Sequence, residues 1–315
     1  MTTMIDFSDA ELSPRNLEYG GRAGEKRGIV FQGDLWFLKF PKNATGMNNI
    51  KGLSYVTSPL SEYIGSNIYR ILGYEVHKTI LGICFDGKRY KVVCACKDFI
   101  QDDKNELLIP YTALRNDTNP ILMEESGDAS LSASNINEIV LQLEHNTVLK
   151  SIPNAKERFW DVAIIDMLIN NNDRNEDNWG VIKNKRSNAY RLSPIYDCGN
   201  CFYGKTSDER IKEIMESEEK LRSSALNGIT AYENDDEKRI RNDALLTLPN
   251  PDLAKSAVRV YGKVMEKWDE IIQLIRDIPS VFKEVDIMSD IRKEYYIETL
   301  RLRRDEILKK AVSAR

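Results

Sequence analysis

Residues 171–180 read NNDRNEDNWG, a polar segment that directly follows the hydrophobic run FWDVAIIDMLIN at 159–170. Three structures place acidic and amide side chains this close together: a calcium-binding loop, a plain turn after a helix, and the catalytic loop of a phosphotransferase. Each belongs to a different architecture, so the choice between them decides the fold.

The calcium-binding loop is excluded by spacing. An EF-hand requires oxygen ligands at loop positions 1, 3 and 5, glycine at position 6 and glutamate at position 12. Asp173, Asn175 and Asp177 supply the first three ligands, but Asn178 replaces the glycine and Asn184 replaces the glutamate. The loop therefore lacks its sharp turn and its bidentate ligand.

The phosphotransferase interpretation requires a catalytic aspartate, with a metal-binding asparagine five residues later. Asp173 and Asn178 have this spacing, and Asp197 in PIYDCGN can supply a second metal ligand. Magnesium binds few protein oxygens together with substrate phosphates, so this pair is sufficient. Taken alone, residues 171–180 favour a plain turn, and the kinase interpretation depends on the rest of the chain.

A kinase also needs a lysine on an N-terminal strand to hold the phosphates. Residues 20–42, GGRAGEKRGIVFQGDLWFLKFPK, predict a glycine-rich turn followed by a hairpin with strands at 28–31 and 35–40. Lys39 in the second strand is the candidate, and its alternative is an edge-strand lysine that prevents aggregation. The glycines do not form a Walker A loop, because no Gly-Lys-Ser or Gly-Lys-Thr follows.

The segment TSPLSEYIGSNIYRILG at 57–73 predicts a helix that is capped by Ser58 and ended by Gly73. Glu62 falls in its first turn, where a favourable helix-dipole interaction and an ion pair with Lys39 are equally consistent. Two further strands are expected at 79–84 and 90–96. The polar segment 102–134 that follows is interpreted as a junction with loops.

The order of these elements indicates an α+β fold with two unequal lobes, 1–100 and 101–315. Strands dominate the first hundred residues, and the pattern is helical from Ile136 onward, with a short strand or hairpin expected only at 190–197.

Composition excludes several classes of protein. With 315 residues, 42% hydrophobic residues and a net charge of −4, the chain is globular, and no direct nucleic-acid binding is expected. Apolar runs fall short of the about 18 residues of a membrane span, and MTTMIDFSDAELS lacks the features of a secretory signal. Five cysteines without such a signal predict reduced thiols in the cytoplasm.

The cysteines and histidines do not favour a different chemistry. Cys94 and Cys96, with the Cys198-x-x-Cys201 pair, offer four thiols, but a one-residue spacing is unusual for zinc, and buried structural thiols are preferred. His77 and His145 have no evident Ser or Cys partner, so a catalytic triad is not indicated.

Taken together, the chain resembles the HipA-like serine/threonine kinases, and among them the compact CtkA-type members. The matching stretches run from about residue 20 to about residue 308, in the order GGRAGEK, LWFLKFPK, PLSEYIGSNI, VVCACKDF, DMLINNNDRNEDNWG and SPIYDCGNCFY. The combination of D-R-x-x-x-N-W-G with P-I-Y-D-C-G is more specific than either half.

The resemblance implies a bilobal, protein-kinase-like fold with a small β-rich N-lobe and a large all-helical C-lobe, using ATP and Mg²⁺. It implies that Asp173 is catalytic, that Asn178 and Asp197 bind the metal, and that Lys39, with Glu62, anchors ATP. The remaining ATP-binding positions implied are Gly20, Gly21 and Gly24 in the glycine-rich loop and the main chain of Ala95, Cys96, Lys97 and Asp98 at the adenine.

The partners implied are a protein substrate with a Ser or Thr acceptor and a small antitoxin or regulatory protein. Three departures from the family are evident: Asn175 stands where relatives often have His, residues 20–27 contain no Ser or Thr for self-phosphorylation, and the additional N-terminal subdomain of longer relatives is not expected. The alternatives are a pseudokinase-like binding module and a small-molecule kinase of the same fold. The intact set of Lys39, Asp173, Asn178 and Asp197 argues against the binding module.

Overall fold

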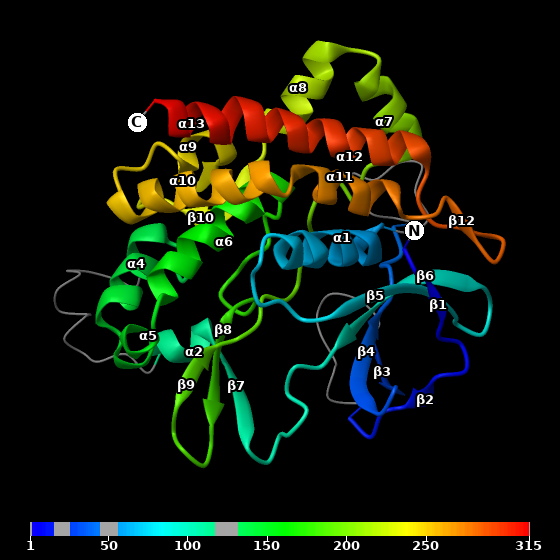
Figure 1. Cartoon of the computed structure of the whole chain (residues 1–315), viewed down its shortest axis with the longest axis horizontal. Helices are drawn as coiled ribbons and strands as arrows, with labels where there is room; N and C mark the ends of the chain where they lie inside the picture. The colour runs from blue at the N-terminus through cyan, green and yellow to red at the C-terminus, as the bar shows by residue number, and fades with distance from the viewer. Residues whose placement is uncertain (1, 16–25, 45–55, 117–131, 315) are drawn as a thin grey trace.

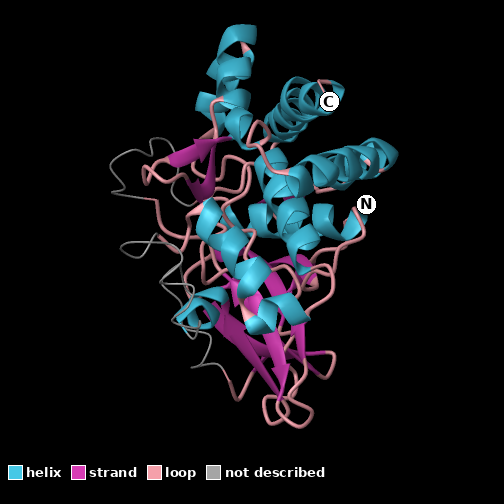
Figure 2. Ribbon diagram, turned by 90° about the vertical axis from the view of Figure 1, so that its left-hand side faces the viewer, coloured by secondary structure: helices cyan, strands magenta, loops and turns pink. Residues whose placement is uncertain are grey.

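The computed structural model describes residues 2–15, 26–44, 56–116 and 132–314. Most strands lie at one end of the molecule and most helices at the other (Figure 2). The largest sheet has the order β1-β5-β6-β4-β3-β2. Its strands are β1 (Ile5–Asp6), β2 (Glu11–Leu12), β3 (Lys26–Phe31), β4 (Asp34–Lys39), β5 (Thr79–Phe85) and β6 (Tyr90–Lys97).

The β3–β4 hairpin that carries Lys39 forms as predicted. Gln32 and Gly33 both have positive φ, 53° and 81°, as a tight two-residue hairpin turn requires. Side chains alternate along β4, so Trp36 and Leu38 enter the small core of the sheet with residues of β5 and β6. Lys39 lies on the opposite face, toward the first helix.

That helix, α1 (Ser58–Ile71), packs against β5 and β6 on one side and α11 (Trp268–Arg276) on the other (Figure 1). Leu60, Ile64 and Ile68, spaced four residues apart, are buried and form an apolar stripe along the helix. Thr57 is the N-cap residue instead of the predicted Ser58, and its side chain makes no capping bond.

Gly65 lets α1 approach the segment after Asp197 closely. A Cβ atom at position 65 would lie 2.8 Å from both Cys198 Cβ and Cys201 Sγ, which is closer than real Cβ contacts allow. The packing of α1 against this segment therefore depends on the absence of a side chain at position 65.

The rest of the described chain is mainly helical and encloses the larger core. Its helices are α2 (Tyr111–Asn116), α4 (Ile136–His145), α5 (Thr147–Ser151), α6 (Ala155–Ile169), α7 (Asp208–Met215), α8 (Glu218–Leu226), α9 (Asn242–Leu245), α10 (Pro251–Glu266), α11 (Trp268–Arg276), α12 (Asp290–Arg303), a π-helical segment (Arg304–Leu308) and α13 (Lys309–Ser313). Within the residues described, no helix combines the length and the apolar character that crossing a membrane requires.

The prediction that the larger lobe is all-helical is not confirmed. An antiparallel sheet joins β7 (Glu106–Pro110), β8 (Gly180–Asn184) and β9 (Tyr190–Leu192), and two small hairpins join β10 (Ile229–Glu233) to β11 (Arg239–Arg241) and β12 (Val281–Phe282) to β13 (Val285–Asp286). These strands are at most five residues long, and β7 lies in a segment interpreted as loops. Such short runs carry too few residues for a period-2 pattern to stand out.

Candidate active site

Three residues that are distant in sequence meet at the edge of a cleft. The Nζ atom of Lys39 in β4 lies 2.8 Å from Glu62 Oε2 in α1 and 2.8 Å from Asp197 Oδ1, which follows β9. The ion pair between Lys39 and Glu62 is therefore present, and an isolated edge-strand lysine is excluded. Asp197 has a φ of 58°, in the left-handed region that aspartate tolerates better than most residues.

The charges of this group reinforce one another. Burial alone would lower the pKa of Lys39, but the carboxylates of Asp197 and Glu62 outweigh burial and hold that pKa well above its usual value. Burial would raise the pKa of Glu62, yet Lys39 and His77 hold it well below the usual range. Lys39 also lowers the pKa of Asp197. All three side chains are consequently charged at neutral pH.

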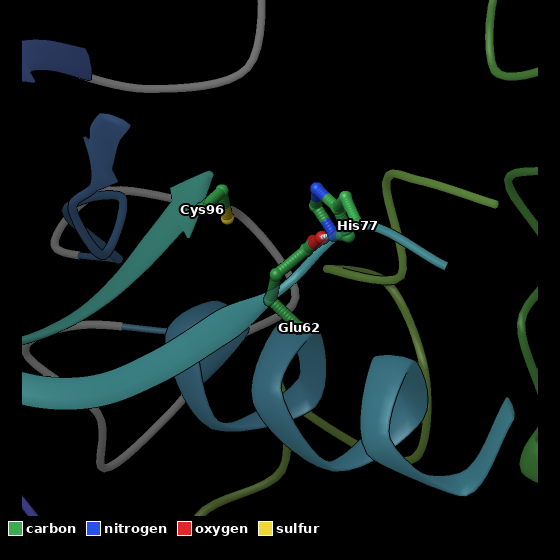
Figure 3. A group of neighbouring side chains, drawn as sticks. All are labelled: Glu62, His77 and Cys96. Atoms are coloured by element: carbon green, nitrogen blue, oxygen red, sulfur yellow. Dashed lines mark ion pairs between the residues drawn. The ribbon is translucent and has the colours of Figure 1, made fainter. Parts of the chain in front are cut away.

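A buried histidine lies behind Glu62. Nε2 of His77 is 2.9 Å from Glu62 Oε1 and 3.2 Å from Ser66 Oγ. Figure 3 shows His77 on the segment before β5, with Glu62 of α1 between it and Cys96 at the end of β6. The main-chain N–H of His77 donates to Ile195 O, two residues before Asp197. His77 thus contacts both carboxylate-bearing segments, although it was expected to stand alone.

The segment 171–180 forms a loop beside this group. The preceding helix α6 ends at Asn170 in the left-handed conformation, with a φ of 55°. Asp173 is exposed and lines the cleft. Asn178 is buried, and its Nδ2 donates to Asp173 O at 2.6 Å.

Arg174 joins this loop to the segment that carries Asp197. Its guanidinium pairs with Asp166 of α6 at 2.8 Å and is buried with it. The same group donates to the main-chain oxygens of Asn178, at 3.1 Å, and of Tyr196. Arg174 therefore contacts one expected metal ligand, Asn178, and the residue that precedes the other, Asp197.

The cleft has a volume of about 480 Å³ and brings Lys39, Asp173 and Asp197 to one surface. Asn178 is not among the residues that line this cleft. Other residues of the lining were not predicted from the sequence: Lys26, Lys42, Asn172, Asn200, Lys205 and Arg239.

The main chain of Ala95–Asp98, expected to contact the adenine, takes part in the hydrogen bonding of the sheet. Ala95 and Cys96 belong to β6, which pairs with β5 on one side and β4 on the other. The N–H of Lys97 donates to Lys78 O and that of Asp98 to Leu35 O. Two main-chain N–H groups of the predicted adenine-binding segment, those of Lys97 and Asp98, therefore already have partners in the protein.

The other predicted positions are the glycines of the glycine-rich loop and the cysteines. Gly20, Gly21 and Gly24 lie outside the described residues. The five cysteines are buried free thiols, and in the described part of the chain Cys94, Cys96, Cys198 and Cys201 form no common metal cluster.

Arg174 was part of the quoted motif but had no assigned role, and His77 and Arg239 were missed. The role of Arg174 could have been predicted from Asp166, because a carboxylate inside the apolar run of α6 needs a buried partner.

Comparison with known proteins gives a match in both sequence and structure with the kinase CtkA. The serine/threonine-protein kinase CtkA of Helicobacter pylori strain J99 is 29% identical over 308 residues, covering 96% of this chain and 86% of the relative. The crystal structure of a proinflammatory kinase CtkA of Helicobacter pylori has a TM-score of 0.82 at 27% identity, covering 99% of this chain and 98% of that chain.

Two other comparisons add nothing to this match. The structure of HipA in a toxin–antitoxin complex with HipB and operator DNA from Shewanella oneidensis covers 96% of this chain and 70% of that chain. Its TM-score of 0.48 at 15% identity is too low to support an inference. No family model matches the chain.

The fold is kinase-like, and the chain is a serine/threonine kinase. Kinases in general use ATP with a divalent metal, and kinases of this class act on protein substrates. Within that class the chain is similar, over nearly its whole length, to the compact kinase CtkA.

Proposed function

We propose that this kinase phosphorylates Ser or Thr residues of proteins, using ATP and Mg²⁺ bound in the cleft at Lys39, Asp173 and Asp197. The observation that supports this best is the ion-paired group, because Nζ of Lys39 lies 2.8 Å from both Glu62 and Asp197. In a kinase, a lysine paired to a helix glutamate holds the phosphates beside the metal-binding aspartate. The proposed lobes are residues 1–100 and 101–315, with the nucleotide between them.

The metal is proposed to bind Asn178 and Asp197, whose oxygens fit magnesium chemically. The Nδ2 atom of Asn178 is engaged with Asp173 O, which leaves its amide oxygen as the ligand. Asp197 uses Oδ1 for Lys39, so the second carboxylate oxygen is available. Bound Mg²⁺ would neutralise charge on the transferring phosphates.

The phosphates are proposed to bind at Lys39, and the adenine next to the end of β6. Gly20, Gly21 and Gly24 would cover the phosphates. We propose that the adenine contacts the main chain of Phe99 and not that of Ala95–Asp98. The main-chain groups of Phe99 make no hydrogen bond to any described residue. The neighbouring carbonyls of Ile100 and Gln101 accept from Arg15.

Asp173 is proposed to orient the acceptor hydroxyl. It is exposed at the cleft surface, where an acceptor side chain can reach it. Because the phosphoryl transition state is loose, this positioning and the charges of Lys39 and the metal carry most of the catalysis. A small antitoxin or regulatory protein remains the predicted partner, and co-purification from the native host tests it.

The test separates Asp173 from Asn178. Asp173→Asn keeps the size and removes the charge, so phosphoryl transfer should fall by about 100-fold or more while ATP affinity is retained. Asn178→Ala should reduce both transfer and affinity, and high magnesium or manganese should recover part of the loss. ATP binding by calorimetry and transfer of labelled phosphate provide the two readouts.

A loop without catalytic function gives a different result. Both variants would then change only stability, by about 1 kcal/mol or less, with equal and small effects on transfer. That outcome would reject the assignment of Asp173 and Asn178.

A further inference from the structure

The cleft carries an excess of positive charge. Two carboxylates line it, Asp173 and Asp197, against five cations: Lys26, Lys39, Lys42, Lys205 and Arg239. Lys39 is ion-paired, whereas the other four have no carboxylate partner among the described residues. Unpaired cations gathered around a cleft attract an anionic ligand.

The lysines on the strand side of the cleft are placed to bind the nucleotide phosphates. Lys26 lies directly opposite Lys39 in the β3–β4 ladder, and Lys42 follows β4 three residues after Lys39. These side chains are therefore close to the group proposed to hold the phosphates, and nucleotide binding is sufficient to explain them.

Arg239 belongs to a different side of the cleft. It begins β11, is exposed, and donates through Nη1 to the main-chain oxygen of Asn172 at 2.9 Å. Asn172 directly precedes Asp173, so the guanidinium is anchored one residue from the group proposed to orient the acceptor. The four other N–H groups of its planar fork remain for a ligand.

Lys205 lies in the segment that contacts the N-terminus of α1. It follows Gly204, whose main-chain oxygen accepts from the N–H of Thr57 at 2.8 Å. Ser58, the first residue of α1, lines the cleft as well. The positive end of the dipole of this 14-residue helix therefore adds to the charge of the lysine.

We propose that Lys205, Arg239 and the first turn of α1, here called the basic rim, bind the acceptor segment and select Ser or Thr residues flanked by acidic side chains. This inference rests on the proposed function, because it places the acceptor at Asp173. Arginine pairs bidentately with carboxylate and phosphate, so Asp, Glu and phosphoserine share the chemistry that the basic rim recognises.

The test uses peptides with one acceptor serine flanked by Glu, Gln, Lys or phosphoserine, at saturating ATP and magnesium. The Glu and phosphoserine peptides should have the lowest KM, and their ratio distinguishes carboxylate from phosphate recognition. Arg239→Gln and Lys205→Gln should each raise the KM of the Glu peptide by about threefold to fivefold, the range of an exposed ion pair. Arg239→Glu should shift the preference toward the Lys peptide.

Arg241→Gln is the matched control. Arg241 lies on the same strand and is exposed, but it pairs with Asp243 at 3.0 Å and does not line the cleft. Its substitution should leave the KM of every peptide unchanged. Equal KM values for the Glu, Gln and Lys peptides would overturn the proposal, and so would rim variants that alter the KM of ATP alone.

A binding measurement separates this inference from the proposed kinase activity. Fluorescence anisotropy of the labelled Glu peptide, with ADP and magnesium present, reports recognition without transfer. Binding that weakens in Arg239→Glu supports the basic rim, even where no peptide receives phosphate and the proposed function fails. Transfer to peptides without any charge preference overturns the basic rim and leaves the proposed function intact.

Discussion

Two ion-paired groups contact residues of the candidate active site, and the two groups differ in their exposure to water. The side chains of Lys39 and Asp197 are 15% and 35% exposed, whereas those of Arg174 and Asp166 are 2% and 3% exposed. A charge at a cleft surface can exchange its partner for a ligand, but a buried charge cannot leave its partner without a large cost. The first group is therefore suited to binding and the second to holding the loop in place.

The largest effect is expected from breaking the buried pair. Arg174→Leu leaves Asp166 without its charged partner and removes the donor to the oxygens of Asn178 and Tyr196. The free energy of unfolding should fall by about 3–5 kcal/mol, as for other broken buried pairs, which urea denaturation measures.

The control for this change is Arg191→Leu. Arg191 is 47% exposed and pairs with Glu75 and Glu106 at the surface, so its loss should cost about 1 kcal/mol or less. Equal stabilities of the two variants would remove the distinction between the two groups.

Lys39→Met should affect phosphoryl transfer more than stability, in contrast to Arg174→Leu. Phosphoryl transfer should fall by about 100-fold or more, since a preorganised donor to the transition state is lost. The loss of stability should be smaller than for Arg174→Leu, because Glu62 keeps His77 and Asp197 reaches solvent. Labelled-phosphate transfer and urea denaturation on the same preparation check both parts. Unchanged transfer would restore the structural interpretation of Lys39.

The smallest of these effects concerns His77, which we interpret as a positioning residue. His77→Leu removes the polar contact to Glu62 and should lower kcat by about tenfold, the value of one hydrogen bond to a charged group. His77→Gln keeps an N–H donor and should recover most of the loss, while the KM of ATP changes less than kcat in both variants.

His145→Leu, at the exposed end of α4, provides the control for the loss of a histidine. If Leu and Gln at position 77 reduce kcat equally, His77 acts through packing and not through Glu62.

The sequence predicts the strands and the helix that carry the ion-paired group, because local patterns determine them. The Gln32-Gly33 turn specifies the β3–β4 hairpin, and the apolar stripe of Leu60, Ile64 and Ile68 specifies α1. The meeting of Lys39 with Asp197 depends on contacts across 158 positions, and only the motif spacing pointed to it.

His77 and Arg239 had no local signal, since their roles arise from where a connection and a hairpin lie in space. The availability of the main chain at Ala95–Asp98 had no local signal either, because a strand sequence does not show how far its ladder extends. Lys97 and Asp98 continue the sheet bonds beyond the expected end of the strand.

Gly65 offers a way to disable the protein without removing any reacting group. A methyl group at position 65 would act as a wedge between α1 and Cys198, which directly follows Asp197. Glu62 lies one turn earlier on the same face of α1, so the wedge would separate the two carboxylates that hold Lys39. Gly65→Ala would therefore provide an inactive reagent with every charged side chain of the cleft and the basic rim retained, suited to capturing acceptor proteins.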